Sequence, residues 1–477
     1  MSHPTAPLEL SSLVAGRKVV STRIHTVHCP YDQHVVGTVA LAGSQDTNAA
    51  IQAALNEKSS LTRFTRATIL DSARKLLEDR RDEFARLITS ESGLCLRETL
   101  YEVGRASDVL RFAANEALRD DGEVFAGDIS PQGKARKIFT LREPLQLAVA
   151  ITPFNHPLNQ VAHKLAPAIA TGAPMILKPS EKTPLTALRF ADLLYEAGLP
   201  APMLSVLLGP SEEVAVPLVR DPRVELVTFT GSVAVGKRIA ETAGYKRLVL
   251  ELGGNDPLIV LADADLELAV HLAAEGSFRN SGQRCTAVKR ILVERAILEE
   301  FTARFVEKAR TYRCGDPFDP ETRVGTVIDE AAAIRLQEVV NKAVAAGARV
   351  LLGGERRGAL LSPTVIADVP RDAEMVVCES FGPLAPLLAV RDLDDAIQLA
   401  NSTPYGLSSG VVTNDLNRAI KAVKGLRTGT VNINEVPGYR IESSPFGGIK
   451  DSGLGIKEGV IEAMKSMTTL KTFSLPW

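Results

Sequence analysis

The chain has 477 residues, of which 45% are hydrophobic, a composition that supports a folded core and excludes a disordered chain. Its net charge of −2 and its pI of about 6.4 lack the basic balance of a nucleic-acid-binding protein, so no nucleic-acid partner is expected. No run approaches the ~18 consecutive apolar residues that cross a bilayer, so no membrane partner is expected.

The cysteines and the N-terminal segment indicate a protein of a reducing compartment. The five cysteines are widely spaced and none forms a CxxC pair, which argues against a disulfide scaffold or a zinc ribbon, so no metal site is expected. Residues 1–20 lack the apolar run of a signal peptide. We therefore expect a cytoplasmic location.

The periodicity of apolar residues predicts the elements in chain order. Amphipathic helices are expected over residues 46–58, 64–88 and 94–119, the last ending at the turn Asp120-Asp121-Gly122. Extended segments follow at 135–141 and 145–151, with a break at Pro144. Strands and helices then alternate: strands at 175–177, 204–208, 226–229 and 258–261, and helices at 185–198 and 211–219. This alternation predicts a parallel sheet covered by helices.

The second half continues in the same style. We expect a helix at 329–346, strands at 348–352 and 386–390, a helix at 393–400, a glycine-rich loop at 446–455, and then a helix and a last strand that ends at Trp477. The length allows about three domain-sized units or one large fold with two lobes.

The densest chemical signal is the segment Asn280-Ser281-Gly282-Gln283-Arg284-Cys285-Thr286. A single cysteine is more often an inert core residue than a nucleophile. Here, however, Gly282 allows the backbone to approach a ligand closely, and Arg284 can lower the pKa of a neighbouring thiol. Cys285 is therefore a candidate nucleophile.

Two further segments offer polar groups at strand ends. Glu251-Leu252-Gly253-Gly254-Asn255 suits a carboxylate presented at the end of a strand, although a salt-bridged surface glutamate fits the same pattern. The turn from Pro153 to Pro157 fixes Asn155, whose amide either bonds the local backbone or donates to a ligand.

A possible phosphate site follows the strand that ends in Phe229-Thr230-Gly231-Ser232. Glycines between a strand and a helix N-terminus suit phosphate binding. Residues 231–237 match the start of a P-loop, but Arg238 stands where that motif needs Ser or Thr, so a P-loop is not expected. No convincing GxGxxG follows the first strand.

Taken together, these segments resemble the aldehyde dehydrogenase superfamily over nearly the whole chain. The matching blocks, in order, are Pro153-Phe154-Asn155, Lys178-Pro179-Ser180-Glu181, Phe229-Thr230-Gly231-Ser232, Glu251-Leu252-Gly253-Gly254, Gly282-Gln283-Arg284-Cys285, Glu379-Ser380-Phe381-Gly382-Pro383 and Pro445-Phe446-Gly447-Gly448. One block is weak evidence, whereas seven blocks in the right order are specific.

The resemblance implies an α/β fold of the aldehyde dehydrogenase type, with two α/β lobes and a β-extension for oligomerisation. A Rossmann-like NAD-binding lobe would comprise residues 1–121 and 146–253, and a catalytic lobe residues 254–455. The extension would comprise residues 122–145 and 456–477. A homodimer or homotetramer is the family expectation.

The resemblance also implies a mechanism for oxidising an aldehyde to a carboxylic acid. Cys285 would attack the aldehyde carbon. Asn155 and the Cys285 backbone N–H would stabilise the resulting oxyanion. Glu251 would activate the water that hydrolyses the thioester.

The dinucleotide residues also come from the resemblance. Lys178 and Glu181 match positions at the adenosine ribose, Gly231 and Ser232 match the diphosphate site, and Glu379 and Phe381 match the nicotinamide-ribose side. A carboxylate at Glu181 would repel a 2′-phosphate, so NAD is favoured over NADP, which stays possible. The alternative for Lys178 and Glu181 is an exposed ion pair worth under about 1 kcal/mol.

The substrate is expected to be a small anionic aldehyde. Arg105, His156 and Arg284 match positions around the substrate tunnel, and paired arginines suit a compact dianion such as a phosphonate. The alternative is that these groups pair with nearby carboxylates.

The segments Phe154–Asn159, Gly282–Arg290 and Pro437–Arg440 resemble the phosphonoacetaldehyde dehydrogenases. Non-phosphorylating glyceraldehyde-3-phosphate dehydrogenases share Arg105 and the Arg284-Cys285 run, but resemble the chain less elsewhere. Phosphonoformaldehyde, succinate semialdehyde and lactaldehyde are further candidate substrates. A CoA-acylating enzyme and a non-catalytic relative are alternatives, against which the intact set of Cys285, Glu251 and Asn155 argues.

Overall fold

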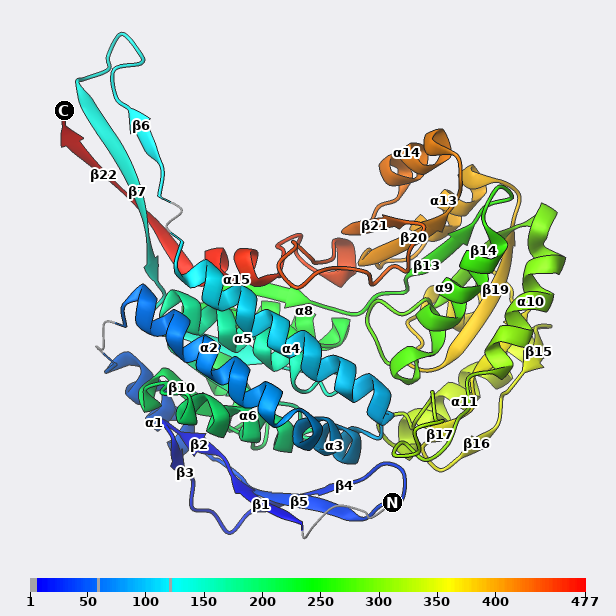
Figure 1. Cartoon of the computed structure of the whole chain (residues 1–477), viewed down its shortest axis with the longest axis horizontal. Coiled ribbons are helices and arrows are strands. Elements are labelled where there is room, and N and C mark those ends of the chain that lie inside the picture. The colour runs from blue at the N-terminus through cyan, green and yellow to red at the C-terminus, as the bar shows by residue number, and fades with distance from the viewer. Residues whose placement is uncertain (1–6, 58–60, 120–121) are drawn as a thin grey trace.

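The computed structural model of the protein describes residues 7–57, 61–119 and 122–477. It contains two α/β lobes, and a narrow β-extension projects from the first lobe (Figure 1). The predicted α/β class with two lobes is confirmed. Residue 58 of the first predicted helix and the Asp120-Asp121 part of the predicted turn lie outside the described residues.

The first lobe is built on a sheet with the strand order β12-β11-β8-β9-β10-β2-β3. The five strands from β12 to β10 run parallel, and β2 pairs antiparallel with β10 and with β3. The strands are β2 (Leu13–Val14), β3 (Arg17–Lys18), β8 (Ala148–Ile151), β9 (Met175–Lys178), β10 (Leu204–Val206), β11 (Leu226–Thr230) and β12 (Arg247–Glu251).

Both faces of this sheet are covered by helices. Along β8, Ala148 and Ala150 pack into one apolar cluster, whereas Val149 and Ile151 pack into another on the opposite face. Successive side chains of a strand point to opposite faces, so a strand covered on both sides reads as a continuous apolar run. The helices are α1 (Ser44–Leu55), α2 (Arg63–Asp79), α3 (Arg81–Ser92), α4 (Leu96–Ala117), α5 (Asn159–Thr171), α6 (Pro184–Glu196), α7 (Ala215–Arg220) and α8 (Val233–Ala243).

Two helix predictions were wrong at their boundaries. The single helix expected at 64–88 is two helices, because Arg80 leaves the helical conformation at φ −106° and ψ 22°. Leu77 and Phe84 are buried on either side of the break, so the apolar spacing hid it. The helix expected at 211–219 begins only at Ala215, because the preceding residues form a turn in which the Pro210 carbonyl accepts from two backbone N–H groups.

The second lobe has a sheet of the order β15-β18-β19-β14-β13-β20-β21, parallel except for β15. Its strands are β13 (Pro257–Val260), β14 (Arg290–Glu294), β15 (Arg349–Leu352), β18 (Thr364–Ala367), β19 (Leu384–Val390), β20 (Ser408–Val412) and β21 (Thr430–Ile433). Its helices are α9 (Leu266–Phe278), α10 (Leu298–Arg310), α11 (Glu330–Ala345), α12 (Glu374–Val377), α13 (Leu393–Asn401) and α14 (Leu416–Gly425).

Three smaller sheets complete the fold. The projecting extension has the order β22-β7-β6, formed by β6 (Val124–Ala126), β7 (Arg136–Pro144) and β22 (Thr468–Pro476). Helix α15 (Val460–Ser466) precedes β22, and Val460 and Ala463 are buried in a core cluster of the first lobe. The others are β1 (Leu8–Ser11), β4 (Ile24–His28) and β5 (Val35–Ala40) at the N-terminus, and the pair β16 (Arg356–Arg357) and β17 (Leu360–Leu361).

Loops at one end of each main sheet define a site between the two lobes. Glu251 ends β12, and the Asn155 turn follows the end of β8, so both lie at the carboxyl edge of the first sheet. Cys285 precedes β14 and Glu379 precedes β19, so both lie at the amino edge of the second sheet. Ligands of parallel α/β sheets bind outside the carboxyl ends of the strands, and here the second lobe covers that edge.

No helix within the described ranges is long and apolar enough to cross a membrane.

The turn after α3 contacts the second lobe, and substitutions in it can test how tightly the two lobes pack. Gly93 has φ +72°, its carbonyl accepts from the Thr326 backbone N–H, and a Cβ there would lie 1.8 Å from the Thr326 Oγ1. Gly198 also has a left-handed φ of +97° but faces open space. We expect Gly198→Ala to cost about 1 to 2 kcal/mol through the backbone alone. Gly93→Ala should cost about 1 to 3 kcal/mol more from overpacking, seen as a lower Tm. Equal Tm values for the two variants would contradict this contact.

Candidate active site

Two side-chain amides join the lobes at the candidate site. Asn155 Nδ2, from the first lobe, donates to the Gln283 carbonyl at 2.8 Å. In return, Asn280 Nδ2 from the second lobe donates to the Asn155 carbonyl at 3.0 Å and to the Gln283 carbonyl at 3.3 Å. Asn155 and Asn280 are both buried, so these bonds fix the proline-bracketed turn against the segment that leads to Cys285.

The segment before Cys285 is a tight left-handed turn. Asn280, Ser281 and Gly282 have φ values of +57°, +52° and +69°. Non-glycine residues in this region cost about 1 to 3 kcal/mol each and persist only where the surroundings enforce them. A Cβ on Gly282 would lie 2.1 Å from the Gly382 carbonyl oxygen. The absence of a Cβ at Gly282 therefore allows this turn to pack against the backbone of a neighbouring loop.

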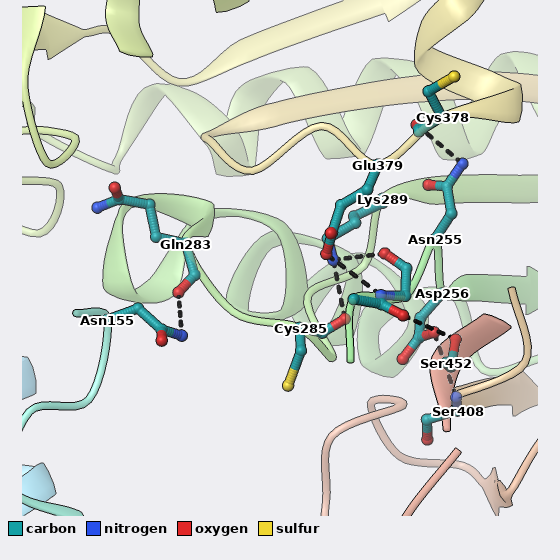
Figure 2. A network of polar contacts seen from close by, with 12 residues as sticks. Asn155, Asn255, Asp256, Gln283, Cys285, Lys289, Cys378, Glu379, Ser408 and Ser452 are labelled. Carbon is teal, nitrogen blue, oxygen red and sulfur yellow. Dashed lines mark hydrogen bonds and ion pairs between the residues drawn. The ribbon is translucent and has the colours of Figure 1, made fainter. Parts of the chain in front are cut away.

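Cys285, Asn155 and Glu251 line one cavity of about 420 Å³, within the range typical of small-molecule sites. The structure thus brings together the three residues expected to carry the chemistry. Figure 2 shows the Cys285 side chain turned away from the polar network behind it, with the Asn155 amide bonded to the Gln283 carbonyl.

The Cys285 thiol is protonated at neutral pH in this structure. Burial raises the pKa of Cys285 to about 11, and Lys289 and Arg440 act in the opposite direction. The sequence pointed to Arg284 for this electrostatic role, whereas Lys289 and Arg440 are the principal cations that act on the thiol. The thiolate is therefore a minor species before substrate binds.

Glu251 is a buried carboxyl group whose pKa is raised by its surroundings. It is 4% exposed, and neither carboxylate oxygen has a hydrogen-bond partner within the described part of the chain. Burial raises the pKa of Glu251 well above its ordinary range, and the nearby Glu458 adds to this, while Lys164 opposes it. Lys164 Nζ and Glu458 Oε1 form a buried ion pair at 2.5 Å behind Glu251.

The cavity also contains four of the residues expected at a dinucleotide. Gly231 and Ser232 line it at the start of α8, and Ser232 Oγ caps this helix by accepting from the Val235 N–H at 3.4 Å. Glu379 and Phe381 line it from the second lobe. A helix N-terminus beside a cavity is a suitable place for a diphosphate.

Lys178 and Glu181 lie outside the lining of this cavity. Lys178 is buried at the end of β9, and its Nζ is 3.3 Å from Glu181 Oε2, whose side chain is 61% exposed. The ion pair considered from the sequence is therefore present, with one partner buried and the other open to solvent.

Arg105 is paired with a carboxylate. Its Nε donates to Glu442 Oε1 at 2.5 Å, and the other Glu442 oxygen is 2.5 Å from His163 Nε2. The alternative considered from the sequence, pairing with a nearby acid, is thus observed for Arg105. Glu442 compensates the charge of Arg105.

Arg284 and Arg440 keep their charges uncompensated by any ion pair among the described residues. Arg284 Nη2 donates to the backbone carbonyls of Glu275 and Gly276 at 3.1 and 2.7 Å, and its buried Nε has no partner in the described ranges. The Arg440 guanidinium stacks 4.0 Å above the Phe446 ring. Burial lowers the pKa of Arg284 to about 10, which leaves it charged at neutral pH.

His156 lies among these arginines as a neutral imidazole. Burial lowers the pKa of His156 well below its ordinary value, and the charges of Arg105, Arg284 and Arg440 lower it further. The His156 ring is 3.2 Å from Asn155 Nδ2. Arg105, His156 and Arg284 do not themselves line the cavity that contains Cys285, so they form a basic cluster beside it.

Three residues of this site had no assigned role in the sequence interpretation: Asn280, Lys289 and Arg440. Lys289 and Arg440 stand inside segments that carried the resemblance, and Asn280 stands just before one. A role for each depends on contacts between loops that lie far apart in sequence. Of the three, Arg440 was the easiest to predict from the sequence, because it is a cation in a segment that resembles enzymes with an anionic substrate.

Comparison with known proteins identifies the family. The profile of the aldehyde dehydrogenase family matches residues 18–473. The 3-sulfolactaldehyde dehydrogenase of Priestia megaterium is 39% identical over 439 residues, covering 92% of each chain. The chain belongs to the aldehyde dehydrogenase family, and the predicted class, an oxidoreductase that acts on aldehydes with NAD(P), is confirmed.

Solved structures agree with this assignment. Aldehyde dehydrogenase 21 from Physcomitrella patens, in complex with the reaction product succinate, has a TM-score of 0.95 at 36% identity and covers 99% of each chain. NADP-dependent glyceraldehyde-3-phosphate dehydrogenase from Bacillus halodurans, complexed with NADP, has a TM-score of 0.95 at 34% identity, covering 98% of this chain and 99% of the other.

The raised thiol pKa predicts slow alkylation at neutral pH. Only the thiolate reacts, so without dinucleotide the rate at which iodoacetamide labels Cys285 should rise about tenfold per pH unit between pH 7 and 10. Peptide mass spectrometry separates Cys285 from the exposed Cys378, and Cys285→Ser provides the blank. A rate that levels off below pH 8 would show that the free thiol is already acidic.

Proposed function

We propose that this enzyme oxidises a small anionic aldehyde to the carboxylic acid with NAD, through a thioester on Cys285, and that phosphonoacetaldehyde is the preferred substrate. The observation that carries the reaction is the shared cavity of Cys285, Asn155 and Glu251. The observation that carries the substrate class is the basic cluster beside that cavity.

In the first step, the Cys285 sulfur attacks the aldehyde carbon and the carbonyl oxygen gains negative charge. Asn155 carries two amide hydrogens; one is fixed on the Gln283 carbonyl, which orients the other for the oxyanion. His156 Nδ1, 3.2 Å from the same nitrogen, competes for this second hydrogen until substrate arrives. One donor of this kind is worth about 3 kcal/mol in an active site.

The thiol must lose its proton for this attack, and Glu251 is the buried group suited to accept it. Glu251 lines the same cavity, and its raised pKa makes it a far better proton acceptor than an ordinary carboxylate. The same carboxylate then takes a proton from the water that cleaves the thioester. Since Glu251 is protonated below its raised pKa, both steps should accelerate as the pH rises.

The dinucleotide supplies the acceptor for the hydride that leaves the tetrahedral carbon. Gly231 and Ser232 would hold its diphosphate at the start of α8, and Glu379 and Phe381 would border the nicotinamide ribose. Glu181 would accept the adenosine ribose hydroxyls, with Lys178 fixing its carboxylate. An acid at this place disfavours a 2′-phosphate, which supports NAD over NADP.

The anion would be bound by Arg284 and Arg440. Glu442 pairs with Arg105, so two guanidinium groups that form no ion pair within the described part of the chain match the two charges of a phosphonate. A neutral His156 offers one N–H donor beside them. One relative is named for a sulfonate aldehyde, one is named for a phosphate aldehyde, and a third is in complex with the reaction product succinate. These support an anionic substrate and keep 3-sulfolactaldehyde and glyceraldehyde-3-phosphate as second candidates.

Replacing either arginine tests the substrate class. Arg284→Gln and Arg440→Gln should each raise KM for phosphonoacetaldehyde about 10- to 100-fold, because a hydrogen bond to a charged group contributes about 1.5 to 3 kcal/mol. KM for propionaldehyde should change little. Steady-state assays of phosphonate, sulfonate, phosphate, carboxylate and neutral aldehydes with NAD and with NADP provide the measurement.

Arg223→Gln is the matched control, because Arg223 pairs with Asp221 on the first lobe away from the cavity. It should leave both KM values unchanged. Equal losses on the anionic and the neutral aldehyde would show that the arginines support the fold and not the anion.

We also propose a homodimer or homotetramer assembled through the extension. Phe473, Leu475 and Trp477 alternate along the chain at the end of β22, so they lie on one face, and all three are exposed, Trp477 at 78%; Leu470 is exposed on the other face. Exposed apolar side chains in a row on a projecting sheet suit burial against another subunit. Sedimentation of the protein as a monomer would contradict this assembly.

A further inference from the structure

One buried ammonium connects three loops of the site. Lys289 Nζ donates to the Gly254 carbonyl at 2.7 Å, to the Cys285 carbonyl at 2.8 Å and to Glu379 Oε1 at 2.5 Å. Figure 2 shows these three bonds converging on the Lys289 side chain behind Cys285. The lysine is 2% exposed, and all three donor positions of its ammonium are used.

The three partners belong to different parts of the proposed chemistry. Gly254 lies in the loop after Glu251, Cys285 is the nucleophile, and Glu379 lies on the side proposed for the nicotinamide ribose. Glu379 is held from a second direction by the Gly254 N–H at 3.2 Å. The Lys289 ammonium also lies 5.6 Å from the centre of the Phe381 ring.

We propose that Lys289 is a positioning residue that couples the dinucleotide side of the cavity to the nucleophile. It holds the Glu379 carboxylate in place for the ribose hydroxyls, and it anchors the Cys285 carbonyl so that the backbone N–H and the sulfur face the aldehyde. This inference rests on the proposed function for the role of Glu379.

A lysine is suited to this junction because it brings charge as well as hydrogen bonds. A buried ammonium is tolerated only where it is fully bonded and paired, and removal of one partner leaves an uncompensated charge. Glu379 supplies the pairing charge. The same positive charge favours the thiolate of Cys285 over the thiol.

The charges around the thiol come from several elements, and each bears on a test of pH dependence. Lys289 and Arg440 favour the thiolate, whereas Asp256 and Glu379 oppose it. On the same segment, Arg284 interacts with the Cys285 charge. Because Lys289 and Glu379 have opposite effects, the contribution of Lys289 must be measured with Glu379 both present and neutralised.

The experiment uses four variants of the full-length enzyme: Lys289→Met, Glu379→Gln, the double variant Lys289→Met/Glu379→Gln, and Lys246→Met as control. Lys246 also donates to two backbone carbonyls, those of Val219 and Asp221, both at 2.7 Å, but it lies before β12 at the opposite edge of the first sheet. Two readouts are taken: the iodoacetamide labelling rate of Cys285 without dinucleotide, and the affinity for NAD by calorimetry.

We expect Lys289→Met to slow labelling at pH 8.5 about tenfold, equivalent to about one pKa unit, and to weaken NAD binding about tenfold. Lys246→Met should change neither. The double variant should be labelled about tenfold more slowly than Glu379→Gln. Its affinity for NAD should equal that of Glu379→Gln. If Lys289 had a purely structural role, its removal would lower Tm, and in the Glu379→Gln background the labelling rate and the NAD affinity would not respond differently.

The double variant lacks the carboxylate that Lys289→Met leaves without its cation, so it keeps the test available if Lys289→Met does not fold. Unchanged labelling between Glu379→Gln and the double variant would overturn the proposal, as would wild-type NAD affinity in a folded Lys289→Met. Labelling requires neither aldehyde nor dinucleotide. An enzyme that failed to bind NAD or oxidise any anionic aldehyde would therefore refute the proposed function without deciding the role of Lys289 at the thiol.

Discussion

The site depends on the bonds by which Asn155 and Asn280 join the two lobes. Each amide donates across the boundary, and both are buried, so neither is replaced by water at low cost. These bonds hold the turn after β8 of the first lobe against the turn that leads to Cys285 in the second. Other contacts, such as that of Thr326 with the Gly93 carbonyl, also join the lobes, but the two asparagines do so directly beside the cavity that Glu251 and Cys285 share.

The left-handed backbone of the turn at residues 280–282 is linked to these bonds between the lobes. Asn280 serves both lobes only because it adopts a left-handed conformation, and the two residues after it do the same. The Gly282 position then packs directly on the Gly382 backbone, which brings the Glu379 loop next to Cys285. Lys289 completes the arrangement from behind the turn. Hydrogen bonds thus connect Cys285, the loop after Glu251 and Glu379 in one unit.

The class of fold, and the three residues that meet in the cavity, could be predicted from the sequence because both depend on local patterns. Alternating apolar runs indicated the parallel sheets, and the matched segments placed Cys285, Glu251 and Asn155. Helix boundaries failed where tertiary packing overrode periodicity, as at Arg80, where buried residues continue across the break. The compensation of Arg105 by Glu442 joins residues that are 337 positions apart, and no local pattern carries such a contact. For the same reason the roles of Lys289 and Arg440 emerge only from the assembled loops.

The central claim is that the aldehyde becomes bonded to Cys285 and is released only by water that Glu251 activates. The most direct measurement mixes Glu251→Gln with NAD and phosphonoacetaldehyde, follows NADH, and determines the intact mass of the quenched protein. At a pH high enough for the thiolate to form without Glu251, the account predicts NADH equal to the number of sites. Turnover should then be about 10²- to 10⁴-fold slower than in the wild type, with the mass of the acyl group added at Cys285. A Glu251→Gln enzyme that turns over at the wild-type rate, or that forms NADH with no mass added at Cys285, would contradict it.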